Sequence, residues 1–494
     1  MRRRAALVPA LLLAGCAVGP NYARPSVPVP PAFKEAPPPG ERPEDWKAAE
    51  PQDRSARGKW WEVFGDADLD ALEEQVDGAN QDLARAEAVF RAARAAARGA
   101  RAELYPTLTG SASVTRARGA TRTANNPPTT TTAYQVPFDL SWEADVFGRI
   151  RRTTESNVAA AQASAADLEA ARLSLHAELA ADWFTLHGLD AEKQLLDTVV
   201  EADATALKLT RNRHDQGIVS GVDVAQAETQ LETNRAEATD LALARAQLEH
   251  AIAILVGKAP SALSIPVAPL RLAPPAIPGE LPSELLERRP DVAAAERRVA
   301  AANAQVGVAS AAFFPRVLLA ASAGWQSNGF TGLFSLPSRF WSIGPSVVET
   351  IFSGGRRRAA VEQAQAGRDA AVAEYRQSVL VAFQDVEDGL AATRILAEEA
   401  GQEAVAVEAA ERLLALSRRR YEGGITTYLE VVIAQTAALN NERTAVELLA
   451  RRMSASVGLV KALGGGWDAS ALPAGHDVLS RKAAAAGTTP SATP

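Results

Sequence analysis

The chain has 494 residues, five histidines, one cysteine and a net charge of -7. This acidic balance argues against nucleic acid as a partner, because phosphate binding needs a clustered basic surface. The histidines are scattered and lie without convergent partners, so we expect no metal, no cofactor and no enzymatic activity.

The N-terminus has the pattern of an export signal. Arginines at positions 2–4 precede an apolar run at 5–13, which is shorter than the roughly 20 residues of a membrane-spanning helix. The segment Leu13-Ala14-Gly15-Cys16 then has the form of a bacterial lipobox. We predict a signal peptide over 1–15 and a lipid on Cys16, with Ala17 favouring sorting to the outer membrane by resemblance to bacterial lipoproteins. A plain signal peptide with a chance cysteine is the alternative.

Residues 16–60 hold Cys16 and a proline-rich stretch from Pro20 to Pro51. Such a stretch cannot be helical, so we expect an extended tether that lets the folded body sit at a distance from its lipid. Because Cys16 is the only thiol, no internal disulfide can form. Stability must then come from packing and oligomerisation.

The interior of the chain repeats itself. Residues 82–87 match 291–296, and residues 213–218 match 420–425, with offsets of roughly 200 residues. Pro106 also matches Pro315 at the offset of the first pair, and a chance match of alanine-rich helices would not reproduce Glu, Pro, Arg and Gly in order. We therefore expect the following divisions: a first repeat at 61–258, a proline-rich connection at 259–284, a second repeat at 285–465 and a flexible tail at 466–494.

In chain order, each half is expected to contain a short helix, two strands, a long helix, a glycine turn and a returning helix. Prolines are absent from 138–259 and 346–472, and an interior proline costs a helix about 3 kcal/mol. The predicted helices are 67–103, 149–216 and 222–256 in the first half, and 285–312, 355–422 and 429–463 in the second. A plain coiled-coil rod would account for these helices, but not for the strands.

Four segments alternate with a period of two residues and are predicted as strands, at about 107–118, 134–147, 315–327 and 339–352. Alternation with aromatic residues towards the ends is typical of a membrane β-barrel. Four strands cannot enclose a bore, whereas three chains would supply twelve. A soluble sandwich edge is the alternative. The side chains predicted to face the membrane are Val136, Phe138, Leu140, Trp142, Trp325, Trp341 and Ile343.

The chain resembles TolC-type outer membrane factors, in particular the lipoprotein branch that serves resistance-nodulation-division efflux pumps. The resemblance rests on residues 16–22, 142–149 and 351–356 and on the duplicated Arg-x-x-x-Gly turns. It implies a mainly α fold with a membrane β-barrel, in which a homotrimer forms a 12-strand β-barrel continued by a 12-helix α-barrel.

The function implied by the resemblance is a lipid-anchored channel in the outer membrane that extends into the periplasm. It would passively conduct small molecules such as drugs, with a periplasmic adaptor, an inner-membrane pump and outer-membrane lipid as partners. An outer-membrane duct for type I protein secretion, built on the same fold, is the alternative. A structural coiled-coil lipoprotein is a third possibility, and it predicts no conductance.

The resemblance also implies roles for the two turns and for the helices beside them. The positions that match adaptor-docking tips are Arg213, Gly217, Arg420 and Gly424, and those that match a periplasmic gate are Asp223, Tyr421, Leu429 and Glu430. A phenol of Tyr421 donating to the Asp223 carboxylate would form a strong lock. The prototype of the TolC-type family has an arginine at the position of Thr426 and an acidic residue at the position of Ile433. Because this chain lacks both, the resemblance implies that Glu430 forms the single acidic ring.

Overall fold

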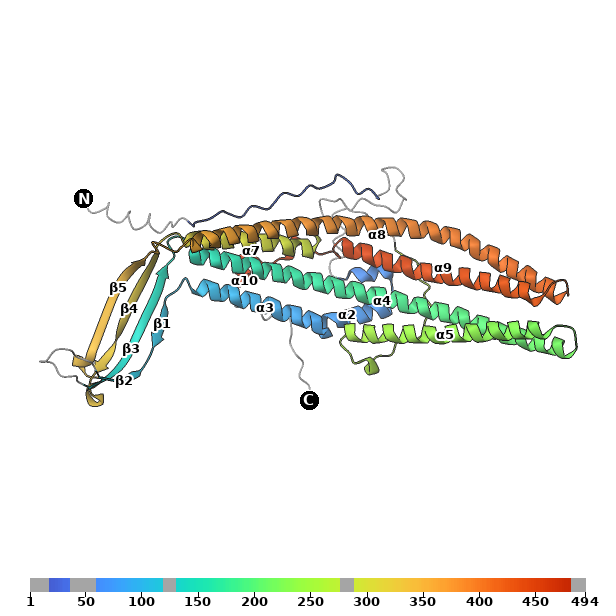
Figure 1. Ribbon diagram of the computed structural model, residues 1–494, viewed down its shortest axis with the longest axis horizontal. Coiled ribbons are helices and arrows are strands. Elements are labelled where there is room, and N and C mark those ends of the chain that lie inside the picture. The colour runs from blue at the N-terminus through green and yellow to red at the C-terminus, as the bar shows by residue number, and fades with distance from the viewer. Residues whose placement is uncertain (1–16, 36–58, 119–129, 276–287, 481–494) are drawn as a thin grey trace.

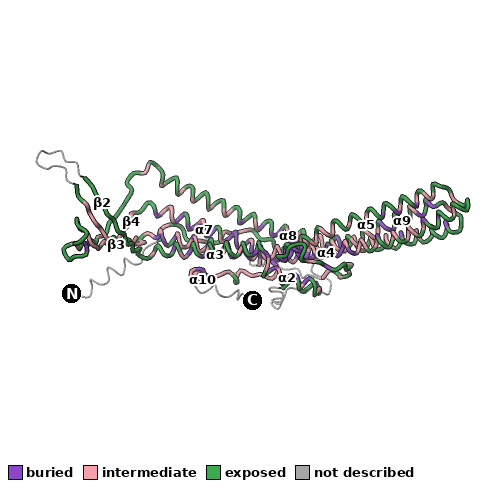
Figure 2. The backbone as a smooth tube through the Cα atoms, turned by 90° about the horizontal axis from the view of Figure 1, so that it is seen from below, coloured by how far each residue is buried: buried purple, intermediate pink, exposed green. Residues whose placement is uncertain are grey.

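The computed structural model describes residues 17–35, 59–118, 130–275 and 288–480. The chain is an elongated body with a small sheet at one end and long helices that lead away from it (Figure 1). Buried residues lie mainly along the helices, while the sheet is largely exposed in the single chain (Figure 2). The predicted mainly α fold with a β region is confirmed. Cys16 and the signal peptide lie outside the described residues.

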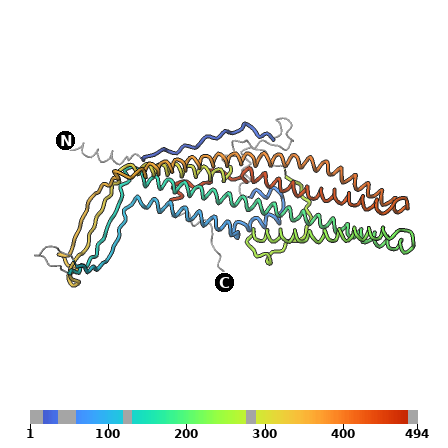
Figure 3. Tube along the Cα trace, viewed as in Figure 1, coloured from blue at the N-terminus to red at the C-terminus, as the bar shows by residue number. Residues whose placement is uncertain are grey.

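Two helical hairpins form the long part of the molecule. Helix α4 (Arg149–Asp215) and helix α8 (Arg356–Glu422) each have 67 residues, a length of about 100 Å at 1.5 Å per residue. The chain then returns through α5 (Gly221–Leu255) and α9 (Tyr428–Ala462), which have 35 residues each. The two turns lie together at the end opposite the sheet (Figure 3). These four predicted helices are confirmed.

The shorter opening helices differ from the prediction. The segment expected as one helix over 67–103 is divided into α2 (Ala67–Ala79) and α3 (Gln81–Ala102). Asn80 breaks it, because this residue is extended, accepts a hydrogen bond from the Leu83 amide and donates to the Leu255 carbonyl. Helix α7 (Pro290–Ala311) begins at a proline, and the predicted start at 285 lies outside the described residues. Among the described residues, no helix combines the length and the apolar character needed to cross a membrane.

The internal repeat is visible in the geometry. Equivalent helices of the two halves have equal lengths. Helices α3 and α7 have 22 residues each, just as the two long helices share one length and the two returning helices share another. Gly257 and Gly464 end the returning helices with φ values of 70° and 93°. A Cβ on Gly257 would lie 2.2 Å from the Ala79 carbonyl oxygen, and one on Gly464 would lie 2.1 Å from the Arg288 carbonyl oxygen. Only glycine fits these two equivalent close approaches.

The sheet is antiparallel, with strand order β1-β3-β4-β5 and β2 also paired with β3. The strands are β1 (Thr107–Gly110), β2 (Ser113–Arg118), β3 (Thr130–Ala144), β4 (Arg316–Ser327) and β5 (Arg339–Val348). The first predicted strand is therefore interrupted. Its register against β3 is unchanged across the break, where the Ser111 amide donates to the Pro137 carbonyl but Pro137 has no N–H to donate in return.

Two strands end earlier than predicted. Strand β3 ends at Ala144, not 147, because the Asp145 carboxylate turns to accept hydrogen bonds from the amides of Ile150 and Arg151 at the start of α4. Strand β5 ends at Val348, not 352, and Arg357 of α8 forms an ion pair with Glu349 immediately beyond it.

The sheet has one apolar and one polar face. Directly opposed residues of antiparallel strands share a face, and the register pairs Phe138 with Ala323 and Trp341, and Leu140 with Ala321 and Ile343. The other face carries Asp139, paired with Ser322 and Ser342. The side chains predicted to face the membrane therefore share one face: Val136, Phe138, Leu140, Trp142, Trp325, Trp341 and Ile343.

The N-terminal segment 17–35 is extended as predicted, but it packs along the helices α7 and α8 instead of leading away from them (Figure 1). The Val18 amide donates to the Phe147 carbonyl at 3.1 Å, the Asn303 side chain donates to the Pro20 carbonyl at 3.0 Å, and Phe33 is buried against α8. The expectation of a free spacer is therefore wrong for this segment.

The expected flexible tail is also partly wrong. After α9 the chain turns through three glycines with positive φ, Gly464, Gly465 and Gly466, and runs back along the body to helix α10 (Gly475–Leu479). Val478 is fully buried, and Arg94 of α3 donates to the Asp477 and Ser480 carbonyls. Short three-ten helices complete the fold: η2 (Trp60–Phe64), η3 (Pro260–Ala262), η4 (Phe330–Gly332), η5 (Leu336–Ser338) and η6 (Ala469–Ala471).

Candidate functional site

The turns that end α4 and α8 have the same hydrogen bonds. The Gly217 amide donates to the His214 carbonyl and the Ile218 amide to the Arg213 carbonyl, each at 2.8 Å. The Gly424 amide donates to Tyr421 and the Ile425 amide to Arg420, at 3.0 and 2.9 Å. Both glycines adopt the left-handed backbone conformation, with φ values of 72° and 73°. This is the Schellman arrangement, in which glycine satisfies the last carbonyls of a helix.

The surroundings of these two glycines are open. A Cβ on Gly217 or Gly424 would meet no atom within 4 Å, in contrast to the crowded glycines at the other ends of the returning helices. Large apolar side chains surround the turns in exposed positions, namely Ile218, Val222 and Ile425. Backbone conformation alone therefore requires glycine here, and the space around the turns is free for a partner.

Tyr421 and Asp223 do not contact each other within the chain. Among the described residues, the buried Tyr421 hydroxyl has no hydrogen-bond partner. The Asp223 carboxylate instead accepts from the amide and the hydroxyl of Ser220, at 2.9 and 2.7 Å, and forms a capping box at the start of α5. The predicted phenol–carboxylate lock is therefore absent from the single chain.

Tyr421 nevertheless joins the two turns. Its ring packs edge-on against Tyr428, with centroids 5.3 Å apart, and the Arg213 guanidinium lies 4.9 Å from its centroid. Such a cation–π contact is stabilising when it is shielded from water. Arg213, which is predicted as a docking residue, therefore also connects the end of α4 to the end of α8.

The remaining predicted gate residues lie at the start of α9. Leu429 is 47% exposed, so its side chain is available to a neighbouring molecule. Glu430 is half exposed and forms an ion pair with Arg420, its Oε2 lying 3.2 Å from Nη1. An ion pair therefore connects Arg420, predicted as a docking residue, to Glu430, predicted to form the acidic ring.

A buried polar cluster that the sequence did not reveal lies farther along the hairpins. The Asp203 carboxylate of α4 accepts hydrogen bonds from Asn234 of α5, at 2.7 Å, and from Gln435 of α9. All three side chains are buried. Burial raises the pKa of Asp203 and, together with the nearby Asp203 charge, raises the pKa of Tyr428 to about 12. The only sequence signal was a polar residue at a core position of each helix.

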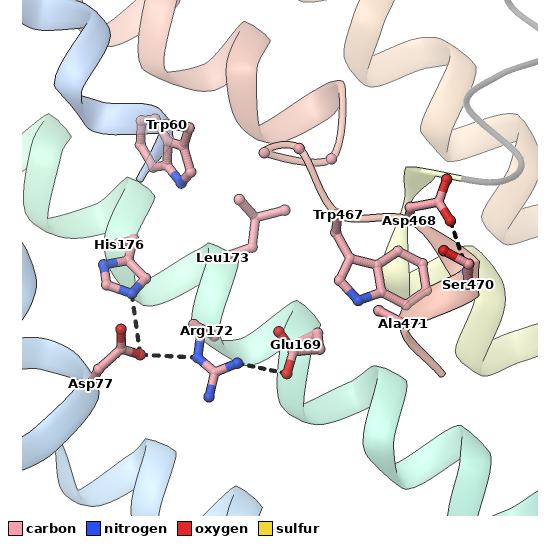
Figure 4. A pocket seen from close by; sticks show the side chains of 13 residues that line it. Trp60, Asp77, Glu169, Arg172, Leu173, His176, Trp467, Asp468, Ser470 and Ala471 are labelled. Carbon is pink, nitrogen blue, oxygen red and sulfur yellow. Dashed lines mark hydrogen bonds and ion pairs between the residues drawn. The ribbon is translucent and has the colours of Figure 1, made fainter. Parts of the chain in front are cut away.

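A second cluster lines a cavity of about 620 Å³ in the middle of the body (Figure 4). Arg172 bridges Asp77 and Glu169 at 2.9 and 2.6 Å, and His176 Nε2 lies 3.6 Å from Asp77. On its other side, His176 Nδ1 is 2.6 Å from the buried Glu73 carboxylate. This network links α2 to α4, and no sequence motif pointed to it.

Comparisons with known proteins agree with this geometry. A family model described as outer membrane efflux protein matches residues 72–258 and 281–465. The outer membrane protein OprJ of Pseudomonas aeruginosa is 34% identical over 469 residues, which are 94% of this chain and 95% of OprJ. The solvent efflux pump outer membrane protein SrpC of Pseudomonas putida is 32% identical, with 93% of this chain and 97% of SrpC covered.

A solved structure of the outer-membrane channel OprN matches with a TM-score of 0.83 and 33% sequence identity. The match covers 92% of this chain and 100% of the OprN chain. Both halves of the internal repeat, the sheet and the turns therefore have counterparts in known proteins. The chain belongs to the outer membrane efflux protein family.

Proposed function

We propose that three copies of this chain form the outer-membrane exit channel of a tripartite efflux pump. The observation that carries the proposal is the sheet: one face is apolar, and within the described residues the outer edge of β5 and the outer edge of β1 and β2 are unpaired. Lipid offers no hydrogen-bond partner, so such edges must be closed by other strands. Four strand positions from each of three chains supply a closed twelve-strand wall.

The helices would continue this wall into the periplasm. Their length of about 100 Å exceeds the roughly 30 Å of a bilayer core, and the turns at the far end are open to a partner. In this proposal a periplasmic adaptor docks at the turns and an inner-membrane pump of the resistance-nodulation-division type supplies the energy. The chain itself conducts passively and performs no catalytic step.

The lipid on Cys16 is part of the same proposal. Residue Ala17 lies against Gly148, where a Cβ would be 2.8 Å from the Ala17 Cα, at the junction of the sheet and α4. An acyl chain on the preceding residue would therefore start at the level where the sheet leaves the membrane. The position of Ala17 at this junction supports a lipid on Cys16, because the anchor would then lie beside the membrane-facing sheet.

The substrates proposed are small molecules with apolar character. SrpC is named as part of a solvent efflux pump, and a second Pseudomonas putida relative, TtgI, as part of a toluene efflux pump. A wide channel selects little by itself, so the pump would set the range of compounds. These names support efflux over protein secretion.

The test compares the wild-type protein with Ile343→Arg and with its neighbour Ser342→Arg. Wild type should purify from detergent at about three chain masses and form pores in planar bilayers. Because Ile343 lies on the apolar face, an arginine there should cost roughly 2–4 kcal/mol per copy and deplete the assembled protein in the outer membrane. Ser342→Arg, on the polar face, should assemble. A monomeric wild type without conductance would contradict the proposal, and equal loss in both variants would contradict the assignment of faces.

A further inference from the structure

Helices α3 and α7 occupy equivalent places in the two halves, but α3 is far less covered. Of the 22 residues of α7, 13 are buried, whereas only four of the 22 residues of α3 are buried. Helix α7 packs against two long helices, α4 and α8, and the N-terminal segment covers it as well. The extensive contacts of α3 are with one long helix, α4, and with the short helix α10. The position of α3 therefore depends strongly on α10.

Helix α10 belongs to a stretch near the C-terminus, residues 474–480, which we call the C-terminal clasp. Its Val478 is fully buried and packs against Ala97 of α3. Arg94 of α3 is 7% exposed and donates to two backbone carbonyls of the clasp, at 3.1 and 3.2 Å. Arg94 and Ala97 are two of the four buried residues of α3. The clasp therefore contacts half of the buried positions that this helix has.

The N-terminal segment makes the corresponding contact on α7. The internal repeat relates residues 82–87 to 291–296, and the same interval relates Arg94 to Asn303. Asn303 donates to a backbone carbonyl of the N-terminal segment, as Arg94 donates to carbonyls of the clasp. The two ends of the chain therefore bind equivalent positions of the two halves, one on α7 and the other on α3.

Helix α3 leads directly into the edge of the sheet. It ends at Ala102, and β1 begins at Thr107. Strand β1 pairs with β3 on one side, and its other side is unpaired within the described residues. A shift of α3 away from α4 would therefore move the strand edge that closes the wall in the proposed assembly.

We propose that the C-terminal clasp holds α3 against α4 and thereby positions β1 for assembly of the channel wall. The inference rests on the threefold assembly proposed above, because that assembly requires the outer edge of β1 to pair with a strand of another copy. Arg94 is a positioning residue in this scheme. It acts on the sheet through α3 and does not itself form part of the wall.

Hydrogen–deuterium exchange of the purified full-length protein in detergent tests the hold of the clasp on α3. In Arg94→Gln and in Val478→Asp, the amides of residues 81–110 should exchange roughly tenfold faster than in wild type, because α3 opens more often. The amides of α7 and β4 should be unchanged, which distinguishes loss of the clasp from general unfolding. The matched controls are Arg98→Gln, at the next arginine of α3, and His476→Asp, at an exposed position of the clasp. Both should follow wild type.

The same variants test the effect on assembly. With all proteins expressed at equal levels, the fraction that runs as a detergent-resistant trimer should fall roughly threefold or more in Arg94→Gln and in Val478→Asp. The trimers that do form should conduct like wild type in planar bilayers, because neither residue lies in the sheet. The two control variants should assemble as wild type does.

The possible outcomes separate the clasp from the proposed function. If wild type is trimeric but neither test variant changes exchange or assembly, the clasp has no positioning role. Faster exchange of α3 without loss of trimer also overturns the inference, because loosening α3 would then have no effect on β1. Uniformly faster exchange in both test variants overturns it as well. If wild type forms neither trimer nor pore, the proposed function itself fails.

Discussion

At the scale of single residues, a buried acid and a buried histidine lie together in the middle of the body. Glu73 of α2 is fully buried beside His176 of α4, and the Trp61 ring stacks on the imidazole with centroids 4.4 Å apart. Burial raises the pKa of Glu73 to about 7. Burial alone would lower the pKa of His176, but the carboxylates of Asp77 and Glu73 outweigh it and raise that pKa.

Both shifts have the same consequence for stability. A raised pKa means that the folded protein binds the proton more tightly than the unfolded chain does. The stabilisation from Glu73 is fully present below its unfolded pKa of 4.5 and is lost as the pH rises through about 7. The contribution of His176 is likewise lost as the pH rises through its folded pKa. The cluster therefore favours the folded state on the acidic side.

Glu73→Gln should remove most of this pH dependence, because an amide keeps the shape of the side chain and does not titrate. We expect the wild-type unfolding temperature to fall more than that of the variant between about pH 5 and about pH 8, by an amount equivalent to roughly 2 kcal/mol. Thermal unfolding in detergent followed by circular dichroism measures this. The exposed Glu87→Gln on α3 is the control and should follow wild type. Parallel curves for wild type and Glu73→Gln would refute the assignment.

At the scale of helices, the Asp203 cluster holds the α4–α5 hairpin to the α8–α9 hairpin. The carboxylate has one partner on each of two other helices, so replacing Gln435 by an apolar residue while the hairpins stay packed leaves it buried with one partner fewer. An unsatisfied buried polar group costs about 1–3 kcal/mol. The cluster therefore favours one particular packing of the two hairpins, because only that packing satisfies the hydrogen bonds of the Asp203 carboxylate.

Gln435→Leu should loosen the start of α9. We expect its amides to exchange with solvent roughly tenfold faster, since 1.4 kcal/mol of lost opening free energy corresponds to a factor of ten. Hydrogen–deuterium exchange read by mass spectrometry gives the rate for residues 428–440. The matched control is Asn440→Leu, the same kind of replacement at an exposed position of α9. Equal protection in wild type and Gln435→Leu would show that the cluster does not hold the hairpins together.

At the scale of the whole molecule, the proposed lipid on Cys16 and the proposed insertion of the sheet would provide two separate attachments to the membrane. The N-terminal segment is held against α7 and α8 by side chains of the body, including Arg152, which donates to the carbonyls of Val18 and Gly19. The apolar face of the assembled sheet would by itself provide a transmembrane surface. One acyl chain contributes only marginal binding compared with such a surface.

Cys16→Ser should therefore abolish acylation without abolishing the pore. Labelled palmitate should be incorporated into wild type and not into the variant, while both assemble as trimers in the outer-membrane fraction and conduct in bilayers. The reason is that in the proposed assembly the strands, and not the lipid, form the continuous wall of the channel. Incorporation of label into Cys16→Ser would exclude this residue as the anchor, and a soluble variant would show that the sheet cannot insert alone.

Much of the fold could be predicted because it follows from local rules. The absence of proline located α4, α5, α8 and α9, and alternation located the strands with their apolar face. Errors arose where one residue interacts across the chain: Asn80 caps two helices, and Pro137 interrupts its partner strand. Of the candidate gate, the side chain of Leu429 is half exposed and the Asp223 carboxylate is bonded to Ser220 in the single chain, and the gate itself stays a prediction.

The sequence by itself determined the duplicated layout, the long helices and the glycine turns, because helix and strand periods, proline and glycine act on the backbone within a few residues. Only the tertiary structure decided that Asp203 binds Asn234 and Gln435, that Arg420 neutralises Glu430, and that the N-terminal segment packs on the helices. These contacts depend on which helix faces meet, and neighbouring residues in the chain do not encode that choice.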